Sequence, residues 1–450
     1  MHGLPASPAV AAADDDPLSA PRSRPLALAS PLPRREDWPK GVRLALVHDL
    51  HEARGLLGPD GPEQRAARSA LFWRARQIRA RARLRLGMHD RGEDFLFGSA
   101  DLCAADAAGH RRHLPLHLKT VHFDSLKLAA GETLDLCAKA DEWPGLHFRE
   151  ELYLWVRIGR LEMGPGSRIA VRGNVCAMEF DTISFAGPPC PQSADWPEIA
   201  FLGTPHAPFS AVRGRDAEAG RQGERGADGR DGASVPVRPG VFGPRSASSG
   251  TAADGGAGEA GGDGGAGGDG RNGGMLMLAD LRIGALAGFG RAKLRVLGKP
   301  GDGAPGAPGG QGGAGGRGGR GGDGFAGVAD AGRGGPGGSG GHGGSGGRGG
   351  QGGLGSNIFV SAPAEDFGRL ELVALPGAGG AGGPGGAGGL GGAGGEGGRR
   401  HGGVDAAPAA AAGREGDAGA AGAAGAHGRS REPPPIHFIP LTESKPFNPE

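Results

Sequence analysis

Glycine recurs at every third position over long stretches of this chain, and this spacing constrains the fold more than any other feature. One stretch begins at Gly309 and reads GGQGGAGGRGGRGGDGFAGVADAGRGGPGG. Glycine accounts for 97 of 450 residues, against an expectation of about 7%. A featureless linker has no reason to keep a phase, whereas a chain with roughly three residues per turn places every third residue on one side. The spacing therefore predicts polyglycine II helices, which are left-handed and extended.

The glycine runs follow one another in pairs. Polyglycine II has no internal hydrogen bonds, so its N–H and C=O groups must bond to neighbouring strands. We expect three polyglycine II hairpins that form a six-helix bundle. Runs three, four and five consist mainly of GGX triplets and are expected inside the bundle, whereas runs one and six keep one glycine per triplet and are expected at its rim. The runs are Gly220–Gly232, Gly255–Gly273, Gly303–Gly327, Gly334–Gly355, Gly379–Gly397 and Gly413–Gly428.

A short apolar phrase recurs between and before the glycine runs. Each copy follows another stretch of alternating apolar residues, such as LYLWVRIGRLEM or NIFV, which is typical of strands. Repetition of one strand-turn-strand unit with insertions of variable length predicts stacked strands, either a β-solenoid or layered sheets. The copies are TLDLCA from Thr133, RIAVRG from Arg168, KLRVLG from Lys293 and RLELVA from Arg369.

These patterns predict a mainly β chain in which the repeated-strand scaffold carries the polyglycine II hairpins, preceded by a short helical region. The helix expected there runs from Pro62 to Gly87 and is rich in arginine. The predicted regions are a disordered Pro/Ala-rich tail (1–38), a helical arginine-rich region (39–115), a β-repeat scaffold (116–213), polyglycine II hairpins interleaved with β-units (214–430), and a closing strand with a tail (431–450).

Composition limits the compartment and the partners. The net charge of +1 gives no overall attraction to nucleic acid or membrane. No apolar run reaches the ~18 residues that a membrane-spanning helix needs, and no signal peptide is recognised, so we expect a cytoplasmic chain or one exported without a cleaved signal. Of the four cysteines, Cys137 and Cys176 lie in apolar, strand-like runs and are expected to be buried free thiols.

No catalytic or metal-binding pattern stands out, and we expect a protein without enzymatic activity, cofactor or metal. His110, His113 and His117 have a spacing that a metal could use, but Pro115 breaks any helix that would align them, and a basic loop is favoured. His48 and His51 lack the second histidine of HExxH, so a solvated turn is expected there.

Over about residues 214–430, the GGX period and the pairing of runs resemble the glycine-rich helix bundles of three groups of proteins. These are the N-terminal domain of Obg-type GTPases, the polyglycine sandwich of some phage tail-tip adhesins and the antifreeze proteins of springtails. The resemblance implies architecture only. The chain has no GxxxxGK[ST], so a GTPase is not supported, and arginine and aspartate at third positions depart from a flat apolar ice-facing plane.

The expected function is a non-enzymatic structural or adhesive binding module, in which a stiff bundle presents its hairpin tips to a protein or cell-surface ligand or to another copy of itself. The expected contact residues at the tip are Phe325, Val328, Asp330 and Arg333. One alternative is a nucleic-acid-binding protein that uses its RGG boxes and the basic helix. A second is a collagen-like filament component. The basic-helix residues are Arg65, Arg68, Arg74, Arg76, Arg79, Arg81, Arg83 and Arg85.

Overall fold

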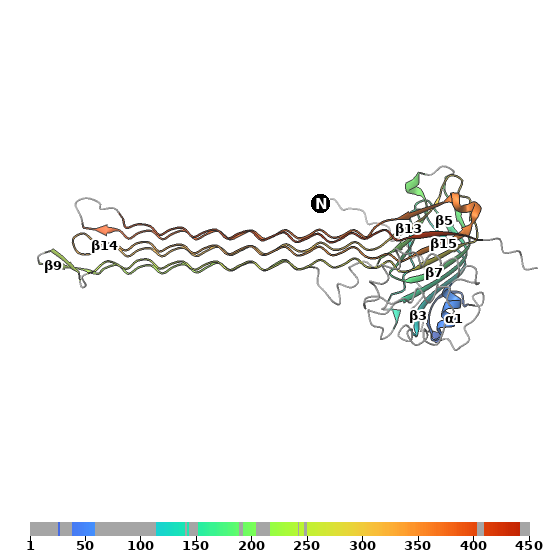
Figure 1. Ribbon diagram of the computed structural model, residues 1–450, viewed down its shortest axis with the longest axis horizontal. Helices are drawn as coiled ribbons and strands as arrows, with labels where there is room; N and C mark the ends of the chain where they lie inside the picture. The colour runs from blue at the N-terminus through green and yellow to red at the C-terminus, as the bar shows by residue number, and fades with distance from the viewer. Residues whose placement is uncertain are drawn as a thin grey trace, which may run out of the picture.

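Figure 1 shows a β-rich head from which a long glycine-rich rod projects. This computed structural model is mainly β, as the strand patterns predicted, with several parallel sheets and few helices. The residues that the structure describes are 26–27, 38–58, 114–139, 142–143, 152–188, 192–203, 217–241, 243–246, 250–402 and 409–441.

The larger sheet of the head is parallel except for one pair of strands, since β2 runs antiparallel to β3. Strand β12 (Leu286–Ala287) also pairs with β7 of this sheet. The region expected to be helical therefore contributes a strand to the same sheet as the predicted scaffold. In spatial order the strands are β1 (Leu26–Ala27), β2 (Gly41–Val47), β3 (Leu116–Leu128), β5 (Leu152–Met163), β7 (Val175–Phe185), β11 (Ala279–Ile283), β15 (Ile358–Pro363) and β18 (Ile436–Leu441).

The smaller sheet is parallel throughout, and from β3 onward its strands alternate along the chain with those of the larger sheet. All four copies of the recurring phrase lie in this sheet. Thr133 pairs with Arg168 and Leu294 with Leu370, so those copies align letter for letter. Sequence reasoning missed β8, which is a further member of the same series. The strands are β4 (Thr133–Asp135), β6 (Arg168–Arg172), β8 (Glu198–Leu202), β13 (Leu294–Lys299) and β16 (Leu370–Ala374).

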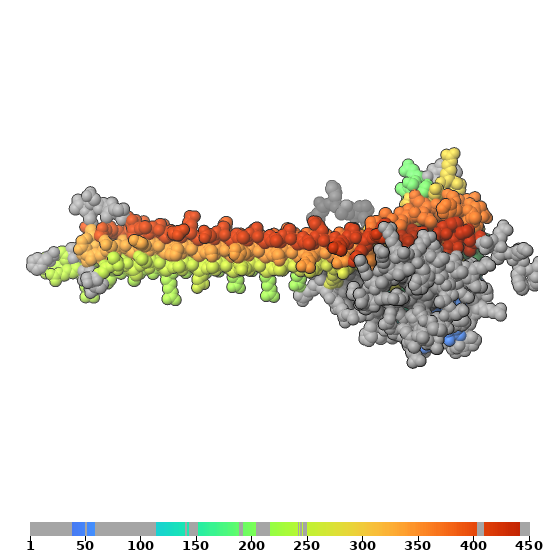
Figure 2. Space-filling model, viewed as in Figure 1, coloured from blue at the N-terminus to red at the C-terminus, as the bar shows by residue number. Residues whose placement is uncertain are grey.

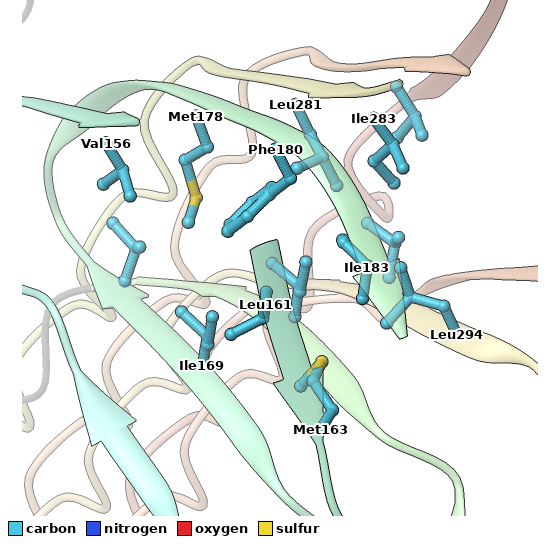
Figure 3. Close-up of a cluster of buried hydrophobic side chains, with 14 of the residues drawn as sticks. Val156, Leu161, Met163, Ile169, Met178, Phe180, Ile183, Leu281, Ile283 and Leu294 are labelled. Carbon is cyan, nitrogen blue, oxygen red and sulfur yellow. The ribbon is translucent and has the colours of Figure 1, made fainter. Parts of the chain in front are cut away.

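The two sheets face each other across the main apolar core. Val156 and Phe180 of the larger sheet belong to the same buried cluster as Ile169 and Leu294 of the smaller one, and Figure 3 shows their side chains gathered between the strands. This burial is the main stabilising term of the head, at about 25 cal/mol for each Å² of apolar surface removed from water.

Charged residues cross the smaller sheet as a ladder of alternating sign. The Arg168 side chain lies 2.7 Å from the Glu198 carboxylate, and Arg295 lies 2.6 Å from the Glu371 carboxylate. Arg295 also approaches Glu198 at 3.9 Å. Because opposite charges on neighbouring strands attract and like charges repel, the ladder favours this stacking order over a shifted one.

A helix covers the other face of the larger sheet. Helix α1 (Leu50–Leu57) begins after Asp49, whose carboxylate accepts the N–H of Glu52 at 3.1 Å, which is the usual N-cap bond. Its Leu57 is buried in a second cluster with Trp155. The solvated turn expected around His51 is wrong, because the Asp49 cap and the apolar face of α1 fold this stretch as a helix. The basic helix expected after Pro62 lies outside the described residues.

The rod consists of six glycine-rich segments that bond side by side. Segment 2 runs antiparallel to segment 1, as in the bond from the Gly262 N–H to the Glu224 C=O at 2.7 Å. The adjacent N–H, from Gly261, bonds to Ser339 of segment 4 at 2.8 Å, and this pairing is parallel. The same pattern repeats every third residue. Rod segments 1 to 6 are defined as residues 217–236, 250–275, 300–323, 330–354, 375–399 and 409–435.

Segments 3 and 4 lie inside the rod and segments 1 and 6 at its rim, whereas segment 5, which was also expected inside, bonds to three other segments, as segment 2 does. Segments 3 and 4 each bond to four other segments, whereas segments 1 and 6 each bond to two. A Cβ at Gly340 would lie 2.0 Å from the C=O oxygen of Gly389 in segment 5, and one at Gly341 would lie 2.0 Å from that of Gly262 in segment 2. An inner segment therefore needs two glycines per triplet, while a rim segment needs one.

The two cysteines in strand-like runs are buried free thiols, as expected. Burial is the main cause that raises the pKa of Cys137 to about 12, although its sulfur accepts the N–H of Arg172 at 3.0 Å. Burial likewise raises the pKa of Cys176. Both thiols are therefore protonated at neutral pH and poor nucleophiles.

Candidate binding surface at the rod tip

Carboxylates along the rod accept backbone N–H groups from neighbouring segments. Asp228 of segment 1 accepts the N–H of Arg317 in segment 3 at 2.8 Å, and Asp254 of segment 2 accepts that of Arg333 in segment 4 at 2.6 Å. The N–H of the third residue in a GGX triplet points out of the rod. In these bonds it donates to a carboxylate and not to a backbone C=O. These aspartates therefore hold neighbouring segments of the rod together, a role that sequence reasoning did not predict.

The bond from Arg317 is the main cause that lowers the pKa of Asp228 below its ordinary value of 3.8. The neighbouring Arg225 guanidinium, at 2.8 Å from the carboxylate, adds to this effect. Asp228 therefore remains ionised, and able to accept both bonds, at any pH near neutrality.

The second pair of segments ends in a tight turn that is tied to the third pair. Strand β14 (Gly324–Phe325) pairs with β17 (Arg400–His401), and the N–H of Ala326 bonds to the His401 C=O at 2.7 Å. Gly327 has φ of 73°, which favours glycine in the turn. A Cβ at Gly402 would lie 2.2 Å from the Phe325 ring, so the ring rests directly on this backbone.

Asp323 joins all three pairs of segments at the tip. Its N–H donates to the Ser234 hydroxyl at 2.9 Å, and its carboxylate accepts the Arg399 N–H at 2.8 Å. Arg320 lies 2.6 Å from the same carboxylate. The bond from Arg399 is the main cause that lowers the pKa of Asp323, with His401 and Arg320 adding to it. Asp323 was not predicted as a tip residue, because its partners are distant in sequence.

The four predicted contact residues lie near this turn but differ in exposure. Phe325 and Val328 are half-buried, whereas Asp330 and Arg333 are exposed. Asp330 forms an ion pair with Arg400. Phe325 thus holds the tip together rather than standing free, which leaves Asp330 and Arg333 as the better candidates for outside contacts.

The first pair of segments ends in a hairpin that sequence reasoning did not predict. Strands β9 (Val237–Gly240) and β10 (Gly243–Ser246) are antiparallel. Figure 1 shows β9 at the far end of the rod, close to β14. Val241, at the hairpin's turn, is 97% exposed. The segment RPGVFGPR, in which Arg-Pro-Gly is mirrored by Gly-Pro-Arg on the other side of Val-Phe, is a signal that could have indicated this hairpin.

The remaining candidates do not contribute to the tip. The arginines of the basic helix, together with His110 and His113, lie outside the described residues. His117 lies in β3, where its ring meets that of Trp143 edge-on at 5.8 Å. Among the residues that the structure describes, no group of histidines, cysteines or carboxylates is arranged to hold a metal ion. The same part of the chain has no helix long and apolar enough to cross a membrane.

Comparison of the chain with protein-family models, with curated proteins and with solved structures found no match.

Proposed function

We propose that this chain is a non-enzymatic structural or adhesive binding module, in which a polyglycine II bundle on a β-solenoid head holds its hairpin tips away from the head. The proposal rests on the backbone hydrogen bonds between the rod segments. N–H groups bond to neighbouring segments every third residue, as in the bonds from Gly255, Gly258 and Gly261 to segment 4. A helix with three residues per turn presents its N–H groups with this period.

The solenoid part of the proposal rests on the order of the strands in the head. From β3 onward, the strands of each sheet follow their order along the chain, and the chain alternates between the two sheets. Each β-unit therefore stacks on the one before it, and the rod segments are insertions between successive units.

The elongated shape of the molecule supports the proposal that the rod is a spacer with its hairpin tips exposed at the far end. At a rise of ~3.1 Å per residue, the third glycine run extends roughly 75 Å. Figure 2 shows that the rod is slender and continuous along this length, with side chains of segment 1 projecting from one edge. Because the rod bonds through its backbone, it can stay stiff without an apolar core of its own, and the free tips are the parts best placed to meet a partner.

The test compares two double variants of the full chain on an array of purified glycans and cell-surface proteins. D330A/R333A removes two exposed charges of the tip, whereas R221A/E224A removes one positive and one negative charge from the side of the rod. We expect the tip variant to lose the binding that the native chain shows, and the rod variant to keep it. Amide exchange at Ala252, whose N–H bonds to the Asp330 C=O at 2.8 Å, checks that the tip stays folded.

Binding that survives the tip variant would overturn the proposal. So would salt-sensitive binding to RNA or DNA that disappears when the arginines between Arg65 and Arg85 are neutralised, since that result favours a nucleic-acid-binding protein.

A further inference from the structure

We propose that the β9–β10 hairpin binds a phosphate or sulfate ester group between Arg238 and Arg245. This inference rests on the proposed function and names the chemistry of the partner that the tip would meet. It starts from the register of the hairpin, in which Arg238 lies directly opposite Arg245, Pro239 opposite Pro244 and Gly240 opposite Gly243.

The register places two guanidinium groups on the same face of a two-stranded sheet. Residues directly opposite each other in an antiparallel pair have Cβ atoms about 4.5–5.5 Å apart. Like charges at such positions repel each other and destabilise a hairpin. Retaining arginine at both positions is therefore unfavourable for the hairpin by itself, and a bound anion removes the repulsion.

Neither arginine is neutralised within the part of the chain that the structure describes. Both are exposed, and no carboxylate there pairs with Arg238 or Arg245. Arg225 and Arg320 differ in this respect, since Arg225 lies 2.8 Å from Asp228 and Arg320 lies 2.6 Å from Asp323. The hairpin thus carries a pair of uncompensated cations at the far end of the molecule (Figure 1).

Two prolines also restrict the backbone of the hairpin beside the arginines. Pro239 and Pro244 fix the backbone next to each arginine, because the proline ring locks φ. Less conformational entropy is then lost when an anion is bound. A guanidinium presents a planar fork of donors that matches the oxygens of phosphate or sulfate, and two forks can hold one tetrahedral group from two sides.

The experiment measures binding of the full chain to dextran sulfate, to polyphosphate and to uncharged dextran. R238Q/R245Q removes the pair, and R221Q/R230Q is the matched control, since it removes two exposed arginines from segment 1. We expect the hairpin variant to bind the charged polymers about tenfold more weakly, because charge-assisted hydrogen bonds are lost. The control should change binding by less than about twofold, because only distant charge is removed.

A lysine variant tests the site independently in case the glutamine substitutions change the structure of the hairpin. R238K/R245K keeps the charge but loses the planar fork, so its binding should fall between the native and glutamine variants. Binding to either polymer that weakens in R238Q/R245Q but not in R221Q/R230Q supports the site, and the polymer that binds better shows whether sulfate or phosphate is preferred. Equal losses in R238Q/R245Q and R221Q/R230Q, or no binding of either polymer by the native chain, would refute it. If array binding still depends on Asp330 and Arg333, the proposed function survives that refutation.

Discussion

At the scale of single residues, a glycine of the rod is needed only where another backbone passes close to it. A Cβ at Gly255 would lie 1.9 Å from the C=O oxygen of Gly319, whereas one at Gly256 would lie 3.1 Å from the Arg230 nitrogen. Residues with side chains already occupy the phase of Gly256 in the same segment, as Ala253 and Glu259 show. Adjacent glycines thus differ in whether they can be replaced by a residue with a side chain.

The first prediction compares alanine at these two positions. G255A should lower the free energy of unfolding by about 1–3 kcal/mol, because the new methyl group has no space and the segments must move apart. G256A should change it by less than about 1 kcal/mol. Thermal or urea unfolding of the full chain measures both. Equal effects would contradict the rod packing described above.

The second prediction concerns the stability of the rod at low pH. The pKa values of Asp228 and Asp323 are lowered in the folded chain from an ordinary value of 3.8. Their contribution to stability is therefore fully present above that value, and it is lost as the pH falls through the lower folded-state values. Protonation of the native chain should destabilise the rod in this range.

The D228N/D323N variant provides the comparison. Asparagine can accept the same N–H without titrating, as Asn272 does for Gln351 at 2.8 Å. The variant should show a smaller fall in melting temperature between about pH 5 and about pH 2 than the native chain. An unchanged acid dependence would show that these two bonds do not contribute to it.

At the scale of elements, the phase of a run matters more than its composition. Gly340 faces segment 5 and Gly341 faces segment 2, and the same pair of faces returns in the next triplet. A change in length by one residue turns every later glycine away from its neighbour, whereas a change by a whole triplet restores the faces.

The third prediction inserts residues between Gly341 and His342. One additional glycine should lower the melting temperature and remove the hydrogen-exchange protection of later amides such as Gly347 and Gly350, since their bonds to segment 3 lose their phase. A Gly-Gly-Ser insertion should preserve most of that protection. If both insertions behave alike, the three-residue period has no role in holding the rod together.

At the scale of the whole molecule, the head determines how the rod is assembled. Parallel strands need crossover connections, and three of these crossovers, after β8, β13 and β16, contain the pairs of rod segments. Neighbouring strands of a sheet lie about 4.8 Å apart. Rod segments that begin or end at neighbouring strands therefore start side by side. The tip then joins the far ends through Asp323, which bonds to Ser234 and Arg399.

The sequence by itself determined the features that depend on local periodicity. The glycine spacing indicated the number of runs and their pairing, and the alternating apolar residues indicated a mainly β scaffold, because both patterns repeat along the chain. The apolar, strand-like runs around Cys137 and Cys176 also identified both cysteines as buried. Helix α1 was missed, because its eight residues make little more than two turns and include Gly55, which favours helix poorly.

Only the tertiary structure decided which residues meet across the segments. Asp228 and Arg317, or Asp323 and Arg399, are far apart in the sequence and lie together because the rod fixes their register. The pairing of Arg238 with Arg245 likewise depends on the turn that connects their strands. The glycine period can be read from the sequence alone. Which residues contact each other depends on how distant segments are aligned in space, and the backbone hydrogen bonds between segments set that alignment.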